Sequence, residues 1–184
     1  MARLREDRQG LFEAKISGYN QAAHYSPWVV IADLNHEAAC APLLKRAWLP
    51  SPAPRMCFRI AVREIESWLL ADSERISSFL KVAKAEIPND TEALGDPKQT
   101  MVQLAGRSRS RAIQEDMVPR PGGGRREGPA YSSRLVEFVM DQERGWRPVV
   151  AARRSDSLAG CLRSLKRLVD QQHPPDLTRS VAVE

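Results

Sequence analysis

The stretch FRIAVREIESWLLAD, residues 58–72, most constrains the fold, because an apolar segment runs directly into one with helical composition. Met56 to Val62 predicts a buried strand, and Glu64 to Ala71 predicts a helix. An earlier apolar run, Trp28 to Asp33, ends in an acid and predicts another buried strand. A predicted helix from about Glu37 to Trp48 lies between the two runs. Strand, helix, strand is the βαβ pattern, whose right-handed crossover makes the two strands parallel.

The remainder of the chain predicts mostly helices. Apolar spacing, caps and prolines place them over residues 7–24, 73–82, 97–105, from 131 onward and from 155 or 156 onward, with a short one possible over 91–94. Residues 107–117 either continue the helix that starts at Pro97 or form another. Pro119 to Pro129 predicts a loop, and residues 173–184 predict a loose tail. The fold class is therefore α/β, a small and largely parallel sheet with many helices, in a single domain over residues 1–172.

Composition bounds the class of protein. The chain has 184 residues, of which 42% are hydrophobic and 28% charged, which is typical of one globular domain. No apolar stretch is long enough to span a bilayer, and the first ten residues are charged where a signal peptide needs a hydrophobic run. These features predict a cytoplasmic protein. Cys40, Cys57 and Cys161 are far apart in apolar surroundings, so we expect reduced thiols.

The net charge of +5 comes from one region of the chain. Residues 107–154 hold eleven arginines, no lysine and six acids, whereas residues 1–106 and 155–184 are balanced. Arginine matches phosphate oxygens and keeps its charge, so this region predicts contact with nucleic acid. The alternative is a solvated arginine-rich surface, which charge alone does not separate from a binding surface. The predicted phosphate-binding residues are Arg63, Arg107, Arg109, Arg111, Arg120, Arg125 and Arg126.

Two acids follow the predicted strands. Asp33 ends the first strand, and Glu64 comes just after the second. Ligands collect beyond the carboxyl ends of parallel strands, and carboxylates that close together repel unless a cation lies between them. The pair therefore predicts a Mg²⁺ or Mn²⁺ site in which Asp33 and Glu64 are catalytic and Asn35 and His36 complete the shell. In the alternative, Asp33 caps the following helix and Glu64 pairs with Arg59 or Arg63.

Glu66 needs a separate interpretation. On a helix, Glu64 and Glu66 lie about 200° apart, so only one of them is expected to face a bound ion. We expect Glu66 to pair with Arg63 and to orient that arginine toward the site. Ile65, Trp68 and Leu69 are predicted to face the core.

Several parts of the sequence together form a recognisable pattern: Val29–Asn35, Cys40, Trp48, Arg59–Asp72 with its R-E-I-E-S-W-L-L-A-D string, the D-P-K at 96–98 and the S-D-S-L at 155–158. In these residues the chain resembles a bacterial family of unknown function that is assigned a Toprim-like fold. The resemblance covers nearly the whole chain and implies a Toprim-like fold with an acidic metal site. Asn35 stands where the family has the second acid of D-x-D. The acidic strand expected before residue 7 is also missing, so the chain looks N-terminally shortened.

Two functions follow as hypotheses. The first is a Mg²⁺-dependent phosphoester hydrolase or nuclease that uses Asp33 and Glu64 and positions the nucleic-acid backbone with arginines. The second is a non-catalytic module with a degenerate metal site, which binds nucleic acid or a protein. A sheet edge left exposed by the missing strand also predicts a homodimer.

Overall fold

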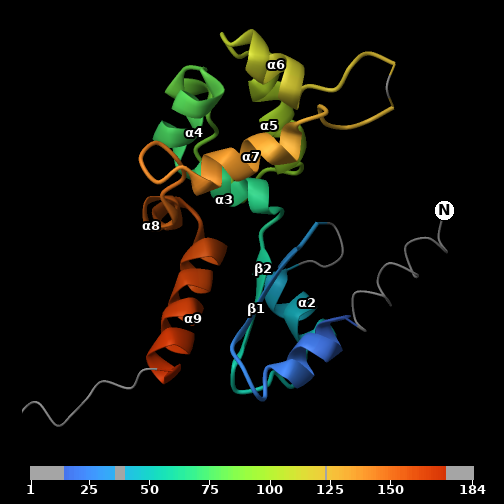
Figure 1. Ribbon diagram of the computed structural model, residues 1–184, viewed down its shortest axis with the longest axis vertical. Helices are drawn as coiled ribbons and strands as arrows, with labels where there is room; N and C mark the ends of the chain where they lie inside the picture. Colours follow the sequence, from blue (N-terminus) through green and yellow to red (C-terminus); the bar gives the residue numbers. More distant parts are fainter. Residues whose placement is uncertain (1–14, 36–39, 123, 173–184) are drawn as a thin grey trace, which may run out of the picture. The chain divides into compact units, whose positions relative to one another are not determined.

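The computed structural model describes residues 15–35, 40–122 and 124–172 (Figure 1). Two strands, β1 (Trp28–Asp33) and β2 (Met56–Ala61), form a two-stranded sheet. The amide of Trp28 donates to the Arg55 carbonyl and that of Leu34 to the Ala61 carbonyl, a pairing that runs in parallel. The predicted α/β class with a small parallel sheet is confirmed, while the Toprim-like identity stays a prediction.

The chain divides into two compact units. One comprises Met1–Ile31, Lys45–Arg59 and Gly160–Glu184, and the other comprises Ala32–Leu44 and Ile60–Ala159. Both strands run from the first unit into the second, so their carboxyl ends belong to the second. The prediction of a single domain over residues 1–172 stays a prediction, as does that of a loose tail, which lies outside the described residues.

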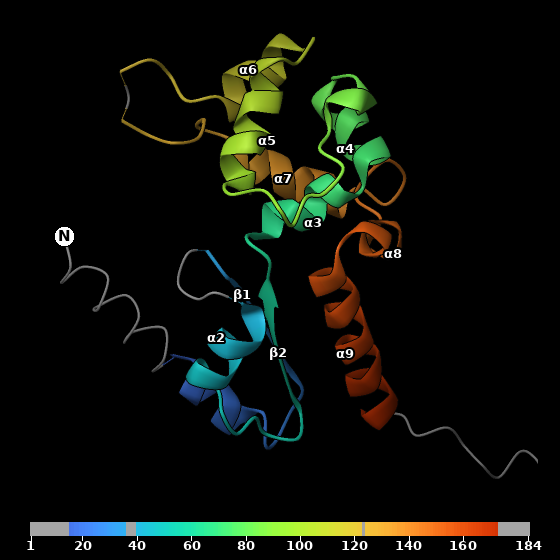
Figure 2. The ribbon, with the colours of Figure 1, turned by 180° about the vertical axis from the view of Figure 1, so that it is seen from behind.

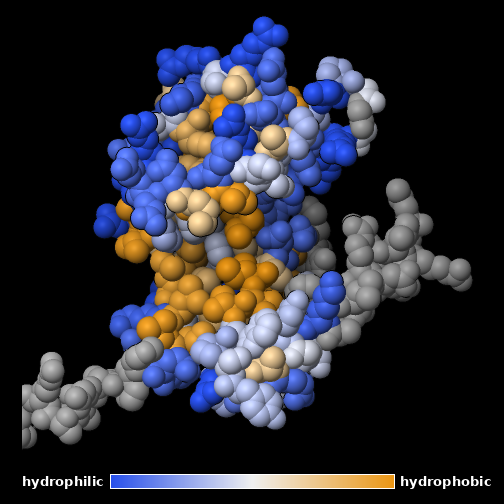
Figure 3. All heavy atoms as spheres, viewed as in Figure 1, coloured by the Kyte–Doolittle hydropathy of each residue, from blue (hydrophilic) through white to orange (hydrophobic). Residues whose placement is uncertain are grey.

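The first unit contains helical residues 15–22, most of the sheet and the helix α2 (Ala41–Trp48), which enters this unit at Lys45. Phe58 is 1% exposed and stacks on Trp48 with ring centroids 6.5 Å apart. Val29 and Ile31 on β1 are exposed, and Figure 3 shows hydrophobic residues gathered at the surface around the strands. The predicted start of α2 at Glu37 lies outside the described residues.

The second unit is mostly helical. Its helices are α3 (Ile65–Ala71), α4 (Ser73–Leu80), α5 (Pro97–Gly106), α6 (Arg111–Met117), α7 (Tyr131–Met140) and α8 (Pro148–Ala151), with 3₁₀ turns at Lys84–Glu86 and Ala152–Arg154. The first residues of α9 (Asp156–Gln172) also belong to it. Figure 2 shows α3 following the end of β2, and α3 packs against α5 and α8.

Polar caps explain where several of these helices begin. Asp72 accepts from the Arg75 amide at the start of α4, and Asp96 accepts from the Gln99 amide at the start of α5, where Pro97 takes the first turn. Ser155 accepts from the Leu158 amide at the start of α9. The helix starts at Ser73, at Pro97 and at residue 155 or 156 are all as predicted.

Trp68 anchors the second unit. It is 2% exposed, and its indole N–H donates to the Ser157 hydroxyl over 2.7 Å. The same hydroxyl donates to Glu92 and accepts from the Val62 amide. Ser157 therefore ties the end of β2 to α3 and to the start of α9. The predicted burial of Trp68 and Leu69 is confirmed.

Two sequence expectations are wrong in detail. Ile65 is 41% exposed, because it is the first residue of α3 and lies beside the strand end rather than against the core. Residues 91–94 are not helical, and the short helical turn lies earlier, at Lys84–Glu86. Among the described helices, none is both long and apolar enough to cross a membrane.

Candidate functional site

Asp33 and Glu64 both lie where a strand ends and a helix begins. Asp33 is the last residue of β1, and its Oδ1 accepts from the amide of Ile65, the first residue of α3. Glu64 precedes α3 with an extended backbone, φ −138° and ψ 161°. Asp33 thus caps α3, and this contact holds it beside Glu64.

Glu64 points to the start of α5. Its Oε2 accepts from the amide of Lys98 over 2.9 Å, so the carboxylate caps the N-terminus of α5 together with Asp96. Negative charge at a helix N-terminus is favourable, because unpaired amides and the helix dipole meet it there. Asp96 also pairs with Arg126 from the loop that precedes α7. The alternative pairing of Glu64 with Arg59 or Arg63 is not what the structure gives.

Glu66 lies in the first turn of α3 and is only 4% exposed. Its Oε1 lies 3.7 Å from the Lys98 ammonium and accepts from the Tyr131 hydroxyl over 3.1 Å. The predicted pair between Glu66 and Arg63 is wrong. The extended backbone at Glu64 lets both glutamates reach the start of α5, and the Arg63 guanidinium instead donates to the Asn35 carbonyl over 3.0 Å.

Lys98 is the basic residue at the centre of this acidic site, which we define as Asp33, Glu64, Glu66, Asp96 and Lys98. Its amide donates to Glu64, its ammonium pairs with Glu66, and its charge acts on Asp33 as well. The ammonium also lies over the Tyr131 ring, 5.8 Å from the centroid. The acidic site therefore contains four carboxylates and one lysine.

The charge of the site is not fully balanced. Burial raises the pKa of Asp33, the negative charge of Glu64 raises it further, and the Ile65 amide and the Lys98 charge oppose them. Burial also raises the pKa of Glu64, the Lys98 amide opposes it, and the charges of Glu66 and Asp96 raise it again. The charged form of both carboxyl groups is thus disfavoured, and a bound cation would relieve this cost in free energy.

A Mg²⁺ ion fits part of the predicted ligand set. The second oxygen of each of Asp33 and Glu64 has no hydrogen-bond partner among the described residues, and Mg²⁺ is usually held by one or two carboxylates, waters and substrate phosphate. No group of three or more His, Cys, Asp or Glu residues that could hold a metal occurs in the described part of the chain. Any cation site here therefore depends on two carboxylates and on added ligands.

The other two predicted members of the metal site differ in what can be said of them. Asn35 has a left-handed backbone, φ 48°, which asparagine tolerates well, and its amide donates to the Arg63 carbonyl. It therefore lies at the strand ends, two residues after Asp33. His36, predicted to complete the shell, lies outside the described residues.

Most of the predicted phosphate-binding arginines lie away from the acidic site. Arg107 follows the end of α5, a ten-residue helix that is about 15 Å long, whereas the acidic site is at its start. Arg107 pairs with Glu86, Arg111 pairs with Glu115, and Arg109 donates to the Lys81 carbonyl. Arg120 and Arg125 are exposed on the loop before α7. Arg126 alone of these six is paired with a residue of the acidic site, through Asp96.

Sequence reasoning missed the roles of Asp96, Lys98 and Tyr131. The D-P-K string at 96–98 carried a usable signal, because Asp-Pro marks a helix start whose third residue carries a free amide and a charge. Tyr131 gave no such signal, since an aromatic residue on an apolar helix face predicts only packing. Comparisons of the chain with protein-family models, with curated proteins and with solved structures found no match.

Proposed function

We propose that this Toprim-like chain is a Mg²⁺- or Mn²⁺-dependent phosphoester hydrolase that acts on nucleic acid. The observation that carries the proposal is the pair of strand-end carboxylates, Asp33 and Glu64, whose pKa values burial and neighbouring negative charge raise. A carboxylate pair of this kind gains most from a divalent cation.

Each residue of the acidic site would have a separate role in this reaction. Asp33 and Glu64 would hold the cation through their free oxygens, and the bound cation supplies neutralising charge and a Lewis acid. Lys98 would attract the phosphate, since its side chain is 33% exposed and is fixed by Glu66 and Tyr131. Arg126 would exchange its Asp96 partner for a phosphate oxygen, because an exposed guanidinium binds phosphate in a bidentate manner.

The longer row of arginines would contact the backbone of the substrate at a distance from the acidic site. Arg107, Arg109 and Arg111 lie beyond the far end of α5, about 15 Å away, and this spacing corresponds to several nucleotides. Nucleic acid is therefore the substrate that suits both features. A small phosphoester would reach only Lys98 and Arg126.

The test is a cleavage assay on single- and double-stranded DNA and RNA with Mg²⁺ or Mn²⁺. Asp33→Asn and Glu64→Gln keep the helix-capping acceptors and remove the negative charge, so we expect at least a hundredfold loss of cleavage. Glu143→Gln, an exposed change, serves as the matched control. EDTA should abolish cleavage by the unmodified protein. Cleavage that survives both changes would refute the assignment.

The alternative is a non-catalytic nucleic-acid- or protein-binding module. The position of Lys98 favours it, because an ammonium 3.7 Å from Glu66 already supplies positive charge where a cation would bind. In that case the protein would bind nucleic acid equally well in EDTA and after Asp33→Asn. The absence of cleavage together with such binding would select this function over the hydrolase.

Homodimerisation through an exposed sheet edge is a third proposal. Within the described residues the sheet has two strands, so no described strand pairs with the outer edge of β1 or of β2. Pairing of two β2 edges about a two-fold axis would bring Arg59 of each copy together, so the edge of β1 is favoured. Light scattering during size exclusion gives the mass, and a monomer at high concentration would contradict the proposal.

A further inference from the structure

A second site lies within the first unit, along the outer edge of β2. It is a cavity of about 230 Å³, whose lining includes four consecutive strand residues, Met56 to Arg59. Consecutive residues of a strand face opposite sides of a sheet, so a cavity that touches all four of them runs along the strand edge. Backbone amide and carbonyl groups at an unpaired edge are available to a ligand.

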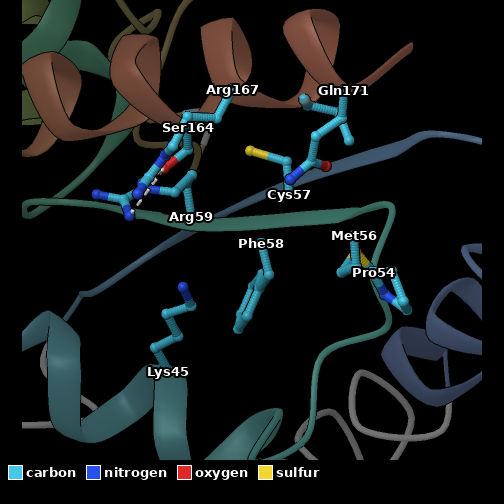
Figure 4. Close-up of a pocket in the computed structure, with 10 residues that line it drawn as sticks. Lys45, Pro54, Met56, Cys57, Phe58, Arg59, Ser164, Arg167 and Gln171 are labelled. Carbon is cyan, nitrogen blue, oxygen red and sulfur yellow. Dashed lines mark hydrogen bonds between the residues drawn. The ribbon is translucent and has the colours of Figure 1, made fainter. Parts of the chain in front are cut away.

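Three basic side chains from three different elements line this cavity. Arg59 comes from β2, Lys45 from α2 and Arg167 from α9, and no acid of the described residues lines it. Figure 4 shows Arg59 and Arg167 on the side of α9 and Lys45 reaching toward the strand from α2. We call this cavity, with its three basic side chains, the cationic cavity.

The positive charges of the cationic cavity have no anionic partner among the described residues. Arg59 and Arg167 both donate to the hydroxyl of Ser164, over 3.4 and 3.2 Å. That hydroxyl is neutral, and it donates in turn to the Gly160 carbonyl. Arg59 Nε is buried and has no hydrogen-bond partner in the described part of the chain. A buried donor without a partner costs free energy, and a ligand oxygen would recover it.

Electrostatics within the cavity agree with this geometry. Burial lowers the pKa of Lys45, and the charges of Arg59 and Arg167 lower it further. Burial raises the pKa of the Cys57 thiol, so at neutral pH this wall of the cavity carries no negative charge. Repulsion among the three cations is thus left for a bound anion to relieve.

Gly160 provides the space in which the Arg59 guanidinium lies. A Cβ built at Gly160 would overlap Arg59 Nη2, the far end of that side chain. Glycine is otherwise unfavourable within a helix such as α9, by about 1 kcal/mol relative to alanine. A close approach of the guanidinium to the helix backbone accounts for its presence.

We propose that the cationic cavity binds a phosphoryl group, held by Lys45, Arg59 and Arg167 at the outer edge of β2. Arginine forks suit tetrahedral oxyanions, and three cations suit a group with two negative charges. The phosphoryl group comes from inorganic phosphate or from a phosphomonoester. No residue of the acidic site lines the cavity, so this inference does not depend on the proposed hydrolase activity.

The test is calorimetric titration of inorganic phosphate into the full-length protein, with EDTA present so that no divalent cation contributes. We expect one phosphate per chain, with saturation below about 1 mM. Lys45→Gln and Arg167→Gln should each weaken binding at least about tenfold, since each removes a charge-assisted contact. Arg46→Gln on α2 and Lys166→Gln on α9 are the matched controls, because both residues are exposed and neither lines the cavity.

Gly160→Ala provides a variant that keeps all three charges. It should displace the Arg59 guanidinium and weaken phosphate binding, while circular dichroism shows an intact helical fold.

Titration of adenosine monophosphate, and of a thymidine dinucleotide without a terminal phosphate, identifies the source of the phosphoryl group. Tighter binding of the monophosphate than of inorganic phosphate assigns a phosphomonoester, and preference for inorganic phosphate assigns the free ion.

Three results would overturn the proposal. The first is no binding of phosphate at about 10 mM, which would mean that the cavity edge serves another purpose, such as pairing with a strand of a second copy. The second is equal weakening by the control changes on α2 and α9, which would indicate general surface charge. The third is equal or tighter binding of the dinucleotide, whose diester lacks the second negative charge.

Discussion

Replacing Lys98 by methionine tests whether this lysine is the internal counter-charge of the acidic site. The change keeps most of the apolar stem and removes the ammonium that lies 3.7 Å from Glu66. At an effective dielectric constant of 20, two unit charges at about 4 Å attract by about 4 kcal/mol. The Glu66 side chain is only 5% exposed, so its charge would be left buried with the Tyr131 hydroxyl as its remaining contact.

The expected loss of stability is smaller than this Coulomb energy. The Lys98 side chain is 33% exposed, so water already screens part of the attraction. Breaking a fully buried pair costs about 3–5 kcal/mol, and we expect roughly 2–3 kcal/mol here. For a chain of this size that corresponds to a fall in Tm of roughly 5–10 °C.

Thermal unfolding followed by circular dichroism at pH 7 measures this effect. Lys98→Arg keeps the charge and should stay near the unmodified protein, and Glu66→Gln added to Lys98→Met should restore much of the lost stability. Mg²⁺ should raise the Tm of Lys98→Met more than that of the unmodified protein, because the lysine no longer competes with the ion. A Tm unchanged by Lys98→Met, or no recovery with Glu66→Gln, would refute the reasoning.

Three further predictions concern stability. Asp33→Asn and Glu64→Gln should each stabilise the fold against urea at pH 7 and lose that advantage near pH 4. Because the pKa values of both carboxyl groups are raised, the native state binds more protons than the unfolded chain. The free energy of unfolding of the unmodified protein therefore falls as pH rises through this range. An advantage that is equal at both pH values would contradict this. Asp72→Ala should lower the free energy of unfolding in urea by about 3 kcal/mol, because the buried carboxylate accepts from the backbone and side chain of Arg147 and caps α4. A loss below about 1 kcal/mol would show that these contacts are unimportant. Gly145→Ala should lower Tm markedly, since a Cβ there would overlap the carbonyl oxygens of Phe138 and Asp141. Gly18→Ala, whose Cβ meets nothing within 4 Å, should leave Tm unchanged or raise it. Equal effects of the two changes would contradict the steric argument.

The sequence predicted the elements near the sheet well, for physical reasons. Apolar runs bounded by prolines and acids leave little choice, so Trp28–Asp33 and Met56–Ala61 are strands with bounds within a residue of those predicted. The start of α5 at Pro97 followed from the proline, whose missing amide is not needed in a first turn.

The partners of the site acids could not be predicted in the same way. Glu66 is paired with Lys98 and Tyr131, 32 and 65 residues further along the chain, whereas sequence spacing favours the local partner Arg63. Helix capping across the fold, as between Glu64 and the Lys98 amide, also depends on where α5 packs. The cationic cavity combines residues from β2, α2 and α9, and no local pattern brings them together.

The most direct test of the central claim is calorimetric titration of Mn²⁺ and Mg²⁺ into the purified protein. The unmodified chain should bind one ion, and both Asp33→Asn and Glu64→Gln should abolish or greatly weaken that binding, while Glu143→Gln leaves it unchanged. Binding that is absent from the unmodified chain, or equally strong in all four proteins, would contradict a cation site at the ends of β1 and β2.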